Sequence, residues 1–133
     1  MTIKRIDHIA IVVEELGAAL QVYEGALGMA LGHVETIPEQ DVKIAFLPAG
    51  DSEIELLEPI NPESGIARYL AQRGEGLHHV CLEVEDLEAT LTELKARGVR
   101  LIDETPRRGA QGRVAFIHPK GARGVLIELI ERD

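Results

Sequence analysis

Apolar and polar positions along the chain follow one order and then repeat it. Residues 6–20 read IDHIAIVVEELGAAL and residues 77–91 read LHHVCLEVEDLEATL, so a shift of 71 positions aligns His8 with His79. The two halves also end alike, because residues 54–56 and residues 127–129 both read Ile-Glu-Leu. Self-similarity at a fixed period is typical of duplicated structural units. We therefore predict two copies of one module.

Within each half, alternating apolar stretches surround one segment of helical periodicity. The predicted strands of the first half are 3–13, 30–37, 42–48 and 52–58, with a helix at 15–27; those of the second are 76–85, 99–104, 112–118 and 124–131, with a helix at 86–97. A further helix is predicted at 65–73, and Gly28 and Gly98 are expected to end the two repeated helices. The fold class is thus α+β, a single domain over residues 1–133. Module 1 covers about 3–59, a connector about 60–75, and module 2 about 76–132.

Four side chains at equivalent module positions share one property. Strand residues alternate between faces, and this alternation places them opposite the apolar residues that pack under the helices. The four are His8, Glu55, His79 and Glu128. If each module's sheet curves, the result is an eight-stranded sheet that cups a metal site. Two imidazoles and two carboxylates suit a divalent ion such as Zn, Co, Ni, Mn or Fe(II).

Other histidines are assigned to structural roles. A lone histidine or glutamate on a strand is more often structural than a ligand, so the repetition is what favours the set of four. His78 lies beside His79 but on the opposite face, and His33 and His118 have no repeat equivalent. His78 is expected to be structural or to contact a ligand from behind, and His33 and His118 are expected to be loop or strand-end residues.

Charge and composition exclude several kinds of partner. The net charge of −9 disfavours nucleic acid and anionic membranes, and aromatic residues for base stacking make up only 3% of the chain. Long apolar runs and a targeting peptide are not visible. The single cysteine, Cys81, cannot form an internal disulfide and is expected to be a small buried strand residue. These features favour a cytoplasmic protein.

Several segments carry a family resemblance over nearly the whole chain. They are residues 6–10 (IDHIA), 55–59 (ELLEP), 74–80 (GEGLHHV), 116–120 (FIHPK) and 124–129 (GVLIEL). The chain resembles the vicinal oxygen chelate (glyoxalase/bleomycin resistance) superfamily and, within it, the methylmalonyl-CoA epimerases. The resemblance implies one divalent ion per chain (Co, Mn, Ni, Zn or similar), with His8, Glu55, His79 and Glu128 as ligands. It also implies an acyl-CoA thioester substrate and a homodimer.

The implied reaction interconverts (R)- and (S)-methylmalonyl-CoA by proton transfer at C2, through a metal-stabilised enolate. Some relatives carry a second glutamate as acid/base where this chain has Ile44, so the second acid/base is left open. Glu128 is the best remaining carboxylate to act also as base. Lys120 is the candidate for substrate binding, and Arg107, Arg108 and Arg113 are either phosphate contacts or ordinary surface charges.

Two alternative functions stay open. A glyoxalase I-like isomerase (lactoylglutathione lyase) uses the same four-ligand plan and also passes through an enolate. A non-catalytic small-molecule-binding module would have no reason to keep all four ligands. A ring-cleaving dioxygenase is disfavoured, because a fourth ligand would block the position that oxygen needs.

Overall fold

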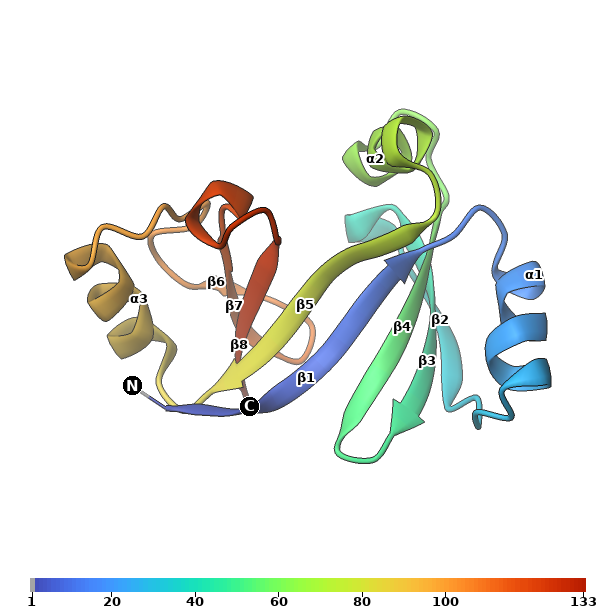
Figure 1. Ribbon diagram of the computed structural model, residues 1–133, viewed down its shortest axis with the longest axis horizontal. Helices are drawn as coiled ribbons and strands as arrows, with labels where there is room; N and C mark the ends of the chain where they lie inside the picture. The colour runs from blue at the N-terminus through green and yellow to red at the C-terminus, as the bar shows by residue number, and fades with distance from the viewer. Residues whose placement is uncertain (1) are drawn as a thin grey trace. The chain divides into compact units, whose positions relative to one another are not determined.

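The computed structural model describes residues 2–133 and shows the α+β architecture expected from the repeat (Figure 1). Hydrogen-bonded strands follow the order β2-β3-β4-β1-β5-β8-β7-β6. The strands are β1 (Ile3–Val12), β2 (His33–Ile37), β3 (Val42–Ala49), β4 (Ser52–Pro59), β5 (Gly76–Val84), β6 (Arg107–Arg108), β7 (Gly112–Ile117) and β8 (Ile127–Arg132). The helices are α1 (Leu16–Leu20), η1 (Gln21–Ala26), η2 (Pro38–Gln40), α2 (Gly65–Arg73), α3 (Leu87–Ala96) and η3 (Pro119–Gly121).

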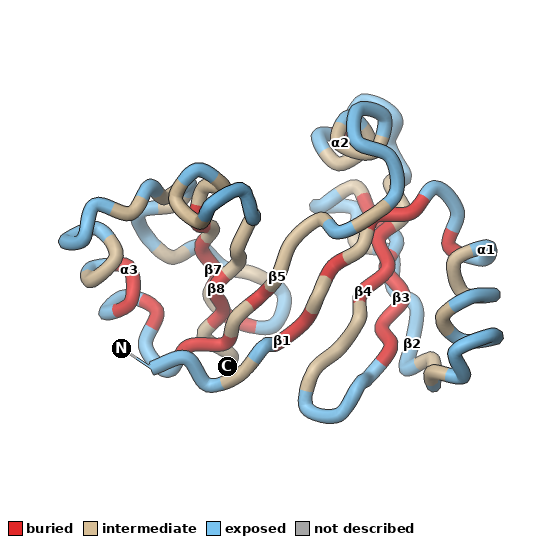
Figure 2. The backbone as a smooth tube through the Cα atoms, viewed as in Figure 1, coloured by how far each residue is buried: buried red, intermediate tan, exposed pale blue. Residues whose placement is uncertain are grey.

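One compact unit contains residues 2–8 and 79–133. In it, β5 pairs in parallel with β8, and β8 pairs antiparallel with β7. Helix α3 packs on this sheet through a buried apolar core (Figure 2), made of Val84, Leu87, Leu91, Ala115, Ile117 and Leu129. Removing these side chains from water is the main stabilising contribution to the unit. The other face of the sheet carries a smaller buried cluster of Cys81, Val114 and Ile130, beside the polar side chains of His79 and Glu128.

Residues 9–78 form the second unit, around the antiparallel strands β2, β3 and β4. Alternation along β3 sends Ala45 and Leu47 to a core with Leu16 of α1, and Ile44 and Phe46 to a second core on the other face. Both faces of the central strand are therefore buried. The three edge-strand residues at 34–36 are exposed instead, because β2 pairs on one side only.

The repeat extends to how the two main helices begin. Glu58, at the end of β4, accepts a hydrogen bond from the backbone N–H of Leu16 (2.7 Å). Glu131, at the end of β8, accepts one from the N–H of Leu87 (2.9 Å). A helix start leaves N–H groups without partners and carries partial positive charge, so a carboxylate there is stabilising. Each module thus uses its last strand to cap its own helix.

Most predicted elements are confirmed within a few residues. The helix predicted at 65–73 matches α2, whose N-cap Ser64 accepts a hydrogen bond from the N–H of Ala67. Gly28 and Gly98 have φ of 74° and 75°, which glycine adopts more readily than other residues.

One local prediction was wrong, and one predicted helix is present with a different geometry in its second half. The strand predicted at 99–104 is absent, and only Leu101 forms an isolated bridge, with Ile117. Asp103 instead accepts a side-chain bond from the N–H of Phe116, so a side chain replaces part of the backbone ladder. The helix predicted at 15–27 widens after Leu20 into a π-helix, in which the N–H of Leu27 bonds the carbonyl five residues back.

Candidate metal centre

Three of the four predicted ligands meet within the first unit. His8 comes from β1, His79 from β5 and Glu128 from β8. The two Nε2 atoms are 3.2 Å apart, and Glu128 Oε1 lies 3.3 Å from that of His8 and 3.1 Å from that of His79. The three side chains are mostly buried, with 9–14% of their surface exposed.

The triangle of these atoms has the size of one face of a metal coordination shell. Ligands about 2.1 Å from an ion lie roughly 3.0 Å apart in an octahedron and roughly 3.4 Å apart in a tetrahedron. The observed separations of 3.1–3.3 Å lie between those values. Imidazole nitrogen with carboxylate oxygen is also the donor set of first-row divalent ions. The residues present therefore fit a divalent metal ion.

The charges around His8, His79 and Glu128 favour a cation between these three side chains. Burial alone would raise the pKa of Glu128, but its contacts with the rings of His79 and His8, which are positively charged when protonated, lower it to about 2. Glu128 is thus an anion beside two imidazole nitrogens, and their lone pairs repel one another unless a proton or a cation lies between them. A metal ion would replace those protons.

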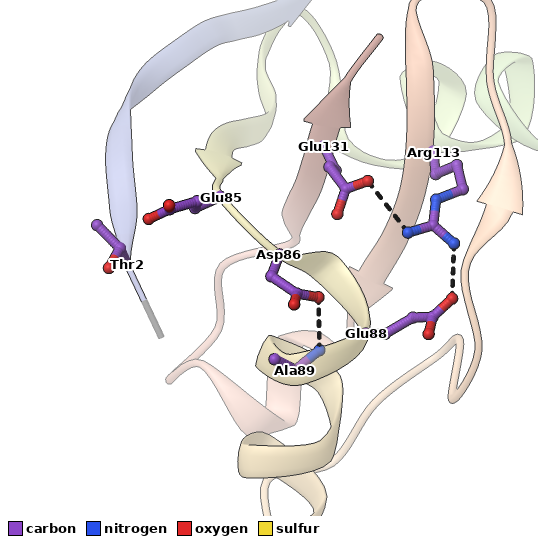
Figure 3. A pocket seen from close by; sticks show the side chains of 7 residues that line it. All are labelled: Thr2, Glu85, Asp86, Glu88, Ala89, Arg113 and Glu131. Carbon is purple, nitrogen blue, oxygen red and sulfur yellow. Dashed lines mark hydrogen bonds and ion pairs between the residues drawn. The ribbon is translucent and has the colours of Figure 1, made fainter.

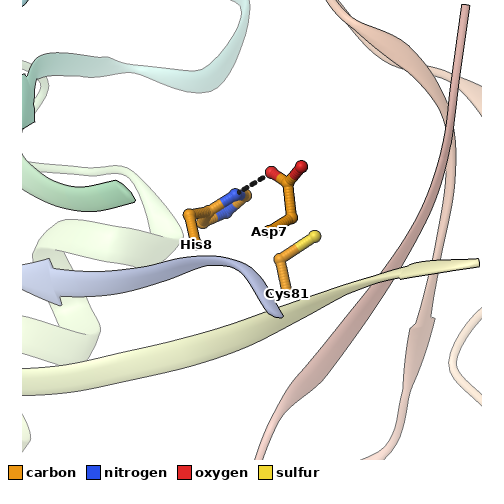
Figure 4. Close-up of side chains that lie close together, drawn as sticks. All are labelled: Asp7, His8 and Cys81. Carbon is orange, nitrogen blue, oxygen red and sulfur yellow. Dashed lines mark hydrogen bonds and ion pairs between the residues drawn. The ribbon is translucent and has the colours of Figure 1, made fainter. Parts of the chain in front are cut away.

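A buried carboxylate that sequence reasoning did not single out lies behind His8 (Figure 4). Asp7, 2% exposed, accepts a hydrogen bond from His8 Nδ1 at 2.8 Å. It also accepts from Arg132 Nε (2.6 Å) and Nη2 (3.1 Å) and from Arg5 Nη2 (3.1 Å). Burial opposes ionisation, but the bonds from His8 and Arg132 outweigh it and hold the pKa of Asp7 well below its usual range. The signal in the sequence was a carboxylate directly before His8 in a strand pattern.

Cys81 lies beside this pair, as Figure 4 shows, and its predicted burial is confirmed at 0% exposure. It is the register partner of Glu128 in the parallel β5–β8 ladder. Burial raises the pKa of the thiol to about 12. Because the thiolate is the nucleophile and the metal-binding form, Cys81 is a neutral wall of the site.

Glu55 is the predicted ligand that belongs to the second unit. It lies on β4, is 8% exposed and is the register partner of Phe46 on β3. Ile44 is buried in the same unit's core, so the position offers no acid/base group.

The other histidines have contacts of their own, and His33 and His118 lie at strand ends as predicted. The ring of His78 packs edge-on against Tyr69 at 4.6 Å between centroids, while its neighbour His79 contacts Glu128. His33 is stacked on Phe46. His118 precedes η3 and accepts a hydrogen bond from the N–H of Lys120.

Cationic side chains around the first unit are mostly neutralised. Arg113 pairs with Glu88 (2.7 Å) and Glu131 (3.1 Å) at an open pocket with acidic walls (Figure 3). Arg107 and Arg108 pair with Asp103 and Asp133. These three arginines have carboxylate partners and are therefore poor phosphate ligands. Lys120 has no ion-pair partner among residues 2–133.

Comparison with known proteins places the chain in a family. The model of the Glyoxalase/Bleomycin resistance protein/Dioxygenase superfamily matches residues 7–116. The chain belongs to this superfamily. The matched segment of this superfamily member contains His8, Glu55 and His79. In residues 2–133, no helix has the length and apolar character needed to cross a membrane.

Its relatives include several epimerases. An ethylmalonyl-CoA/methylmalonyl-CoA epimerase of Cereibacter sphaeroides is 39% identical, over 96% of this chain and 97% of that protein. The crystal structure of methylmalonyl-CoA epimerase from Mycobacterium tuberculosis shows 41% identity and a TM-score of 0.88, covering 98% of this chain and 89% of that one. A methylmalonyl-CoA epimerase in complex with methylmalonyl-CoA and NH4+ shows 37% identity and a TM-score of 0.86, covering 98% and 96%. A probable lactoylglutathione lyase of Vibrio cholerae is 30% identical over 98% of this chain and 93% of that protein.

Proposed function

We propose that this protein is a metal-dependent epimerase that interconverts (R)- and (S)-methylmalonyl-CoA by moving the proton at C2. The observation that carries the proposal is the convergence of His8 Nε2, His79 Nε2 and Glu128 Oε1 in a chain whose relatives include named methylmalonyl-CoA epimerases. A divalent ion bound there supplies a Lewis acid for the negative charge that develops on the thioester oxygen.

The protein's residues divide the remaining work. His8, His79 and Glu128 hold the ion, and we assign Glu55 as the fourth ligand. Both ion pairs of Glu128 with the histidines use Oε1, so Oε2 is the oxygen that we assign to accept the C2 proton. A carboxylate of low pKa is a weak base, but the acidity of the C2 proton rises when the adjacent carbonyl is polarised. Ile44 cannot return a proton, so Glu128 serves at least one face of C2.

Lys120 is the residue that we assign to the acyl-CoA substrate. It lies in η3, is exposed and has no carboxylate partner among residues 2–133, unlike the arginines at 107, 108 and 113. In a chain of net charge −9, an unpaired cation is a preferred contact for a phosphate or carboxylate. Lys120→Ala should raise KM for the CoA thioester more than it lowers kcat.

Deuterium exchange tests the reaction directly. Methylmalonyl-CoA is incubated in deuterated water with the metal-loaded protein, and the C2 proton is followed by proton NMR. The proposal predicts metal-dependent loss of that signal and scrambling of the (R) and (S) forms. Exchange no faster than with metal alone would exclude the epimerase.

The second candidate function is a glyoxalase I-like isomerase, favoured by the identity with the probable lactoylglutathione lyase. Methylglyoxal with glutathione is the substrate for that arm of the same experiment. Product formation from methylglyoxal and glutathione, without C2 exchange in methylmalonyl-CoA, would favour the isomerase over the epimerase. Metal binding without turnover of either substrate would indicate a non-catalytic binding module.

Two further properties belong to the proposal. We expect a homodimer, since two-fold dimers are the commonest soluble oligomers, and sedimentation equilibrium checks it. We also expect a cytoplasmic location, because the only cysteine is buried as a thiol and forms no disulfide.

A further inference from the structure

Behind His8, hydrogen bonds connect the candidate metal ligand to an arginine on a different strand. Arg132 on β8 donates two hydrogen bonds to the Asp7 carboxylate, Nε to Oδ1 and Nη2 to Oδ2. Asp7 Oδ2 in turn accepts the bond from His8 Nδ1. The side chain of Asp7 is 1% exposed, so it is held by these contacts and not by water.

We propose that Asp7, clamped by Arg132, is a positioning residue that fixes the tautomer and ring orientation of His8 so that Nε2 presents its lone pair to the metal. The inference rests on the proposed function for the identity of that metal. Because an ionised carboxylate can only accept, its contact with His8 requires the proton on Nδ1. Neutral imidazole carries one proton, so the lone pair that can coordinate a metal is then on Nε2.

The strands explain why the clamp acts on the whole site. Arg132 and Glu128 are four residues apart on β8, and therefore on one face of that strand. One strand thus delivers a ligand to the metal position and a clamp to the residue behind another ligand. The separation of the three ligand atoms then depends on Asp7 as well as on the ligands.

The internal repeat shows that the position is specialised. The residue equivalent to Asp7 under the 71-residue shift is His78, which carries no carboxylate to offer its neighbour His79 and whose ring packs edge-on against Tyr69. A requirement of the fold would apply to both modules. The anionic partner therefore belongs to the environment of His8 and not to the duplicated scaffold.

Bulk stabilisation is a weak explanation for the same contacts. A buried ion pair often adds little to stability, because desolvation offsets the attraction between its charges. A second buried carboxylate, Glu83, pairs with Arg5 at 2.7 Å, and Arg5 also contacts Asp7. Glu83 belongs to the same charged cluster through Arg5, whereas Asp7 is the carboxylate that accepts from His8 Nδ1, and Glu83 is therefore the matched control.

Asp7→Asn makes a specific prediction. Both carboxylate oxygens accept bonds, so the amide NH2 must face a donor in either orientation. Arginine donors from Arg132 and Arg5 meet at Oδ1, and arginine stays protonated. The amide oxygen is therefore expected at Oδ1 and the NH2 group opposite His8 Nδ1. His8 relieves that contact by moving its proton to Nε2, the nitrogen that faces the metal position.

The first measurement needs no metal. Two-bond 15N–1H NMR of the metal-free protein at about pH 9, where ordinary imidazole is neutral, assigns the His8 tautomer. We expect the proton on Nδ1 in the unmodified protein and in Glu83→Gln, and on Nε2 in Asp7→Asn. A proton on Nε2 in the unmodified protein, or an unchanged tautomer in folded Asp7→Asn, would overturn the inference even if the protein is an epimerase.

The second measurement is Co²⁺ affinity with the visible spectrum of the bound ion. Changes to such outer carboxylates weaken metal binding by about 10–100-fold, and we expect this for Asp7→Asn. Arg132→Lys should lie between Asp7→Asn and the unmodified protein, since it keeps the charge but not the two-bond clamp. Equal weakening in Glu83→Gln would show a general disturbance of the cluster and would refute the positioning role. Tautomer control by Asp7 in a protein that then fails to exchange C2 would refute the proposed function alone.

Discussion

Replacing His79 should weaken metal binding far more than replacing its neighbour His78. His79 Nε2 lies 3.1 Å from Glu128 Oε1 and 3.2 Å from His8 Nε2, whereas His78 packs on Tyr69. Both lie on β5, so the two alanine variants delete the same side chain one position apart. We expect His79→Ala to lose metal affinity and His78→Ala to keep it, with about one ion per chain.

The size of the effect follows from the number of ligands. Structural zinc sites with four ligands bind with about 10–16 kcal/mol, or roughly 3 kcal/mol per ligand, so losing one weakens binding at least about 100-fold. At a metal concentration near 1,000 times Kd, binding stabilises the folded chain by about 4.1 kcal/mol. A 100-fold weaker site retains about 1.4 kcal/mol under the same conditions. For a chain of this length the difference is worth about 10 °C in Tm.

Thermal unfolding with and without metal measures this quantity. The unmodified protein and His78→Ala should show the same rise in Tm on adding Co²⁺ or Zn²⁺, and His79→Ala a rise about 10 °C smaller. Metal-free Tm values control for the loss of packing in each variant. If His78→Ala loses as much of the metal-dependent rise as His79→Ala, then strand alternation does not select the ligand and the site has been assigned wrongly.

Four further expectations concern carboxylates and the thiol. Glu55→Gln should keep metal and much of the C2 exchange, whereas metal-loaded Glu128→Gln should lose exchange on the order of 100-fold, because an amide cannot accept the proton; equal rates would make Glu128 a ligand only. Since the folded-state pKa of Glu128 is lowered from 4.5 to about 2, its stabilisation of the metal-free protein is complete above pH 4.5 and is lost as pH falls toward 2. Urea titrations should therefore show a weaker acid dependence in Glu128→Gln. Cys81 should resist a thiol reagent until the protein unfolds, and rapid labelling of native protein would contradict its burial. Glu131→Ala should lower the free energy of unfolding by about 1 kcal/mol through loss of the α3 cap, measured by urea denaturation against Glu93→Ala on the exposed helix face.

Much of the fold was predictable because alternation and periodicity report burial. Strands β1, β5 and β8 each place one alternate set of apolar residues in a core with a helix, and the opposite set includes the predicted ligands. The structure departs from the predicted elements where a local contact replaces the regular backbone hydrogen bonds of a strand or helix. Asp103 takes the N–H of Phe116 by its side chain, and the turn after Leu20 widens by one residue. Neither event changes the apolar pattern, so periodicity could not reveal it.

The candidate site could be predicted from the sequence only in part. The convergence of His8, His79 and Glu128 could be predicted because histidine and glutamate occur at strand positions that repeat in the two halves. Asp7 could not be found in this way, because the repeat places His78 at its equivalent position. Its task depends on Arg132, which is 125 residues away in sequence and is brought to it by the position of β8 in the sheet.

Repetition and its exceptions therefore carry different information in this chain. Features present in both modules, such as the Glu58 and Glu131 caps, serve the scaffold, because each module must end its last strand and begin its helix. The histidines and glutamates that we propose as ligands are also repeated, and one ion would need donors on several strands. Exceptions to the repeat mark positions where the two halves differ in chemistry. Asp7 gives His8 an anionic partner that the equivalent residue of the second module does not supply, so the two imidazoles are expected to differ in tautomer control and in basicity.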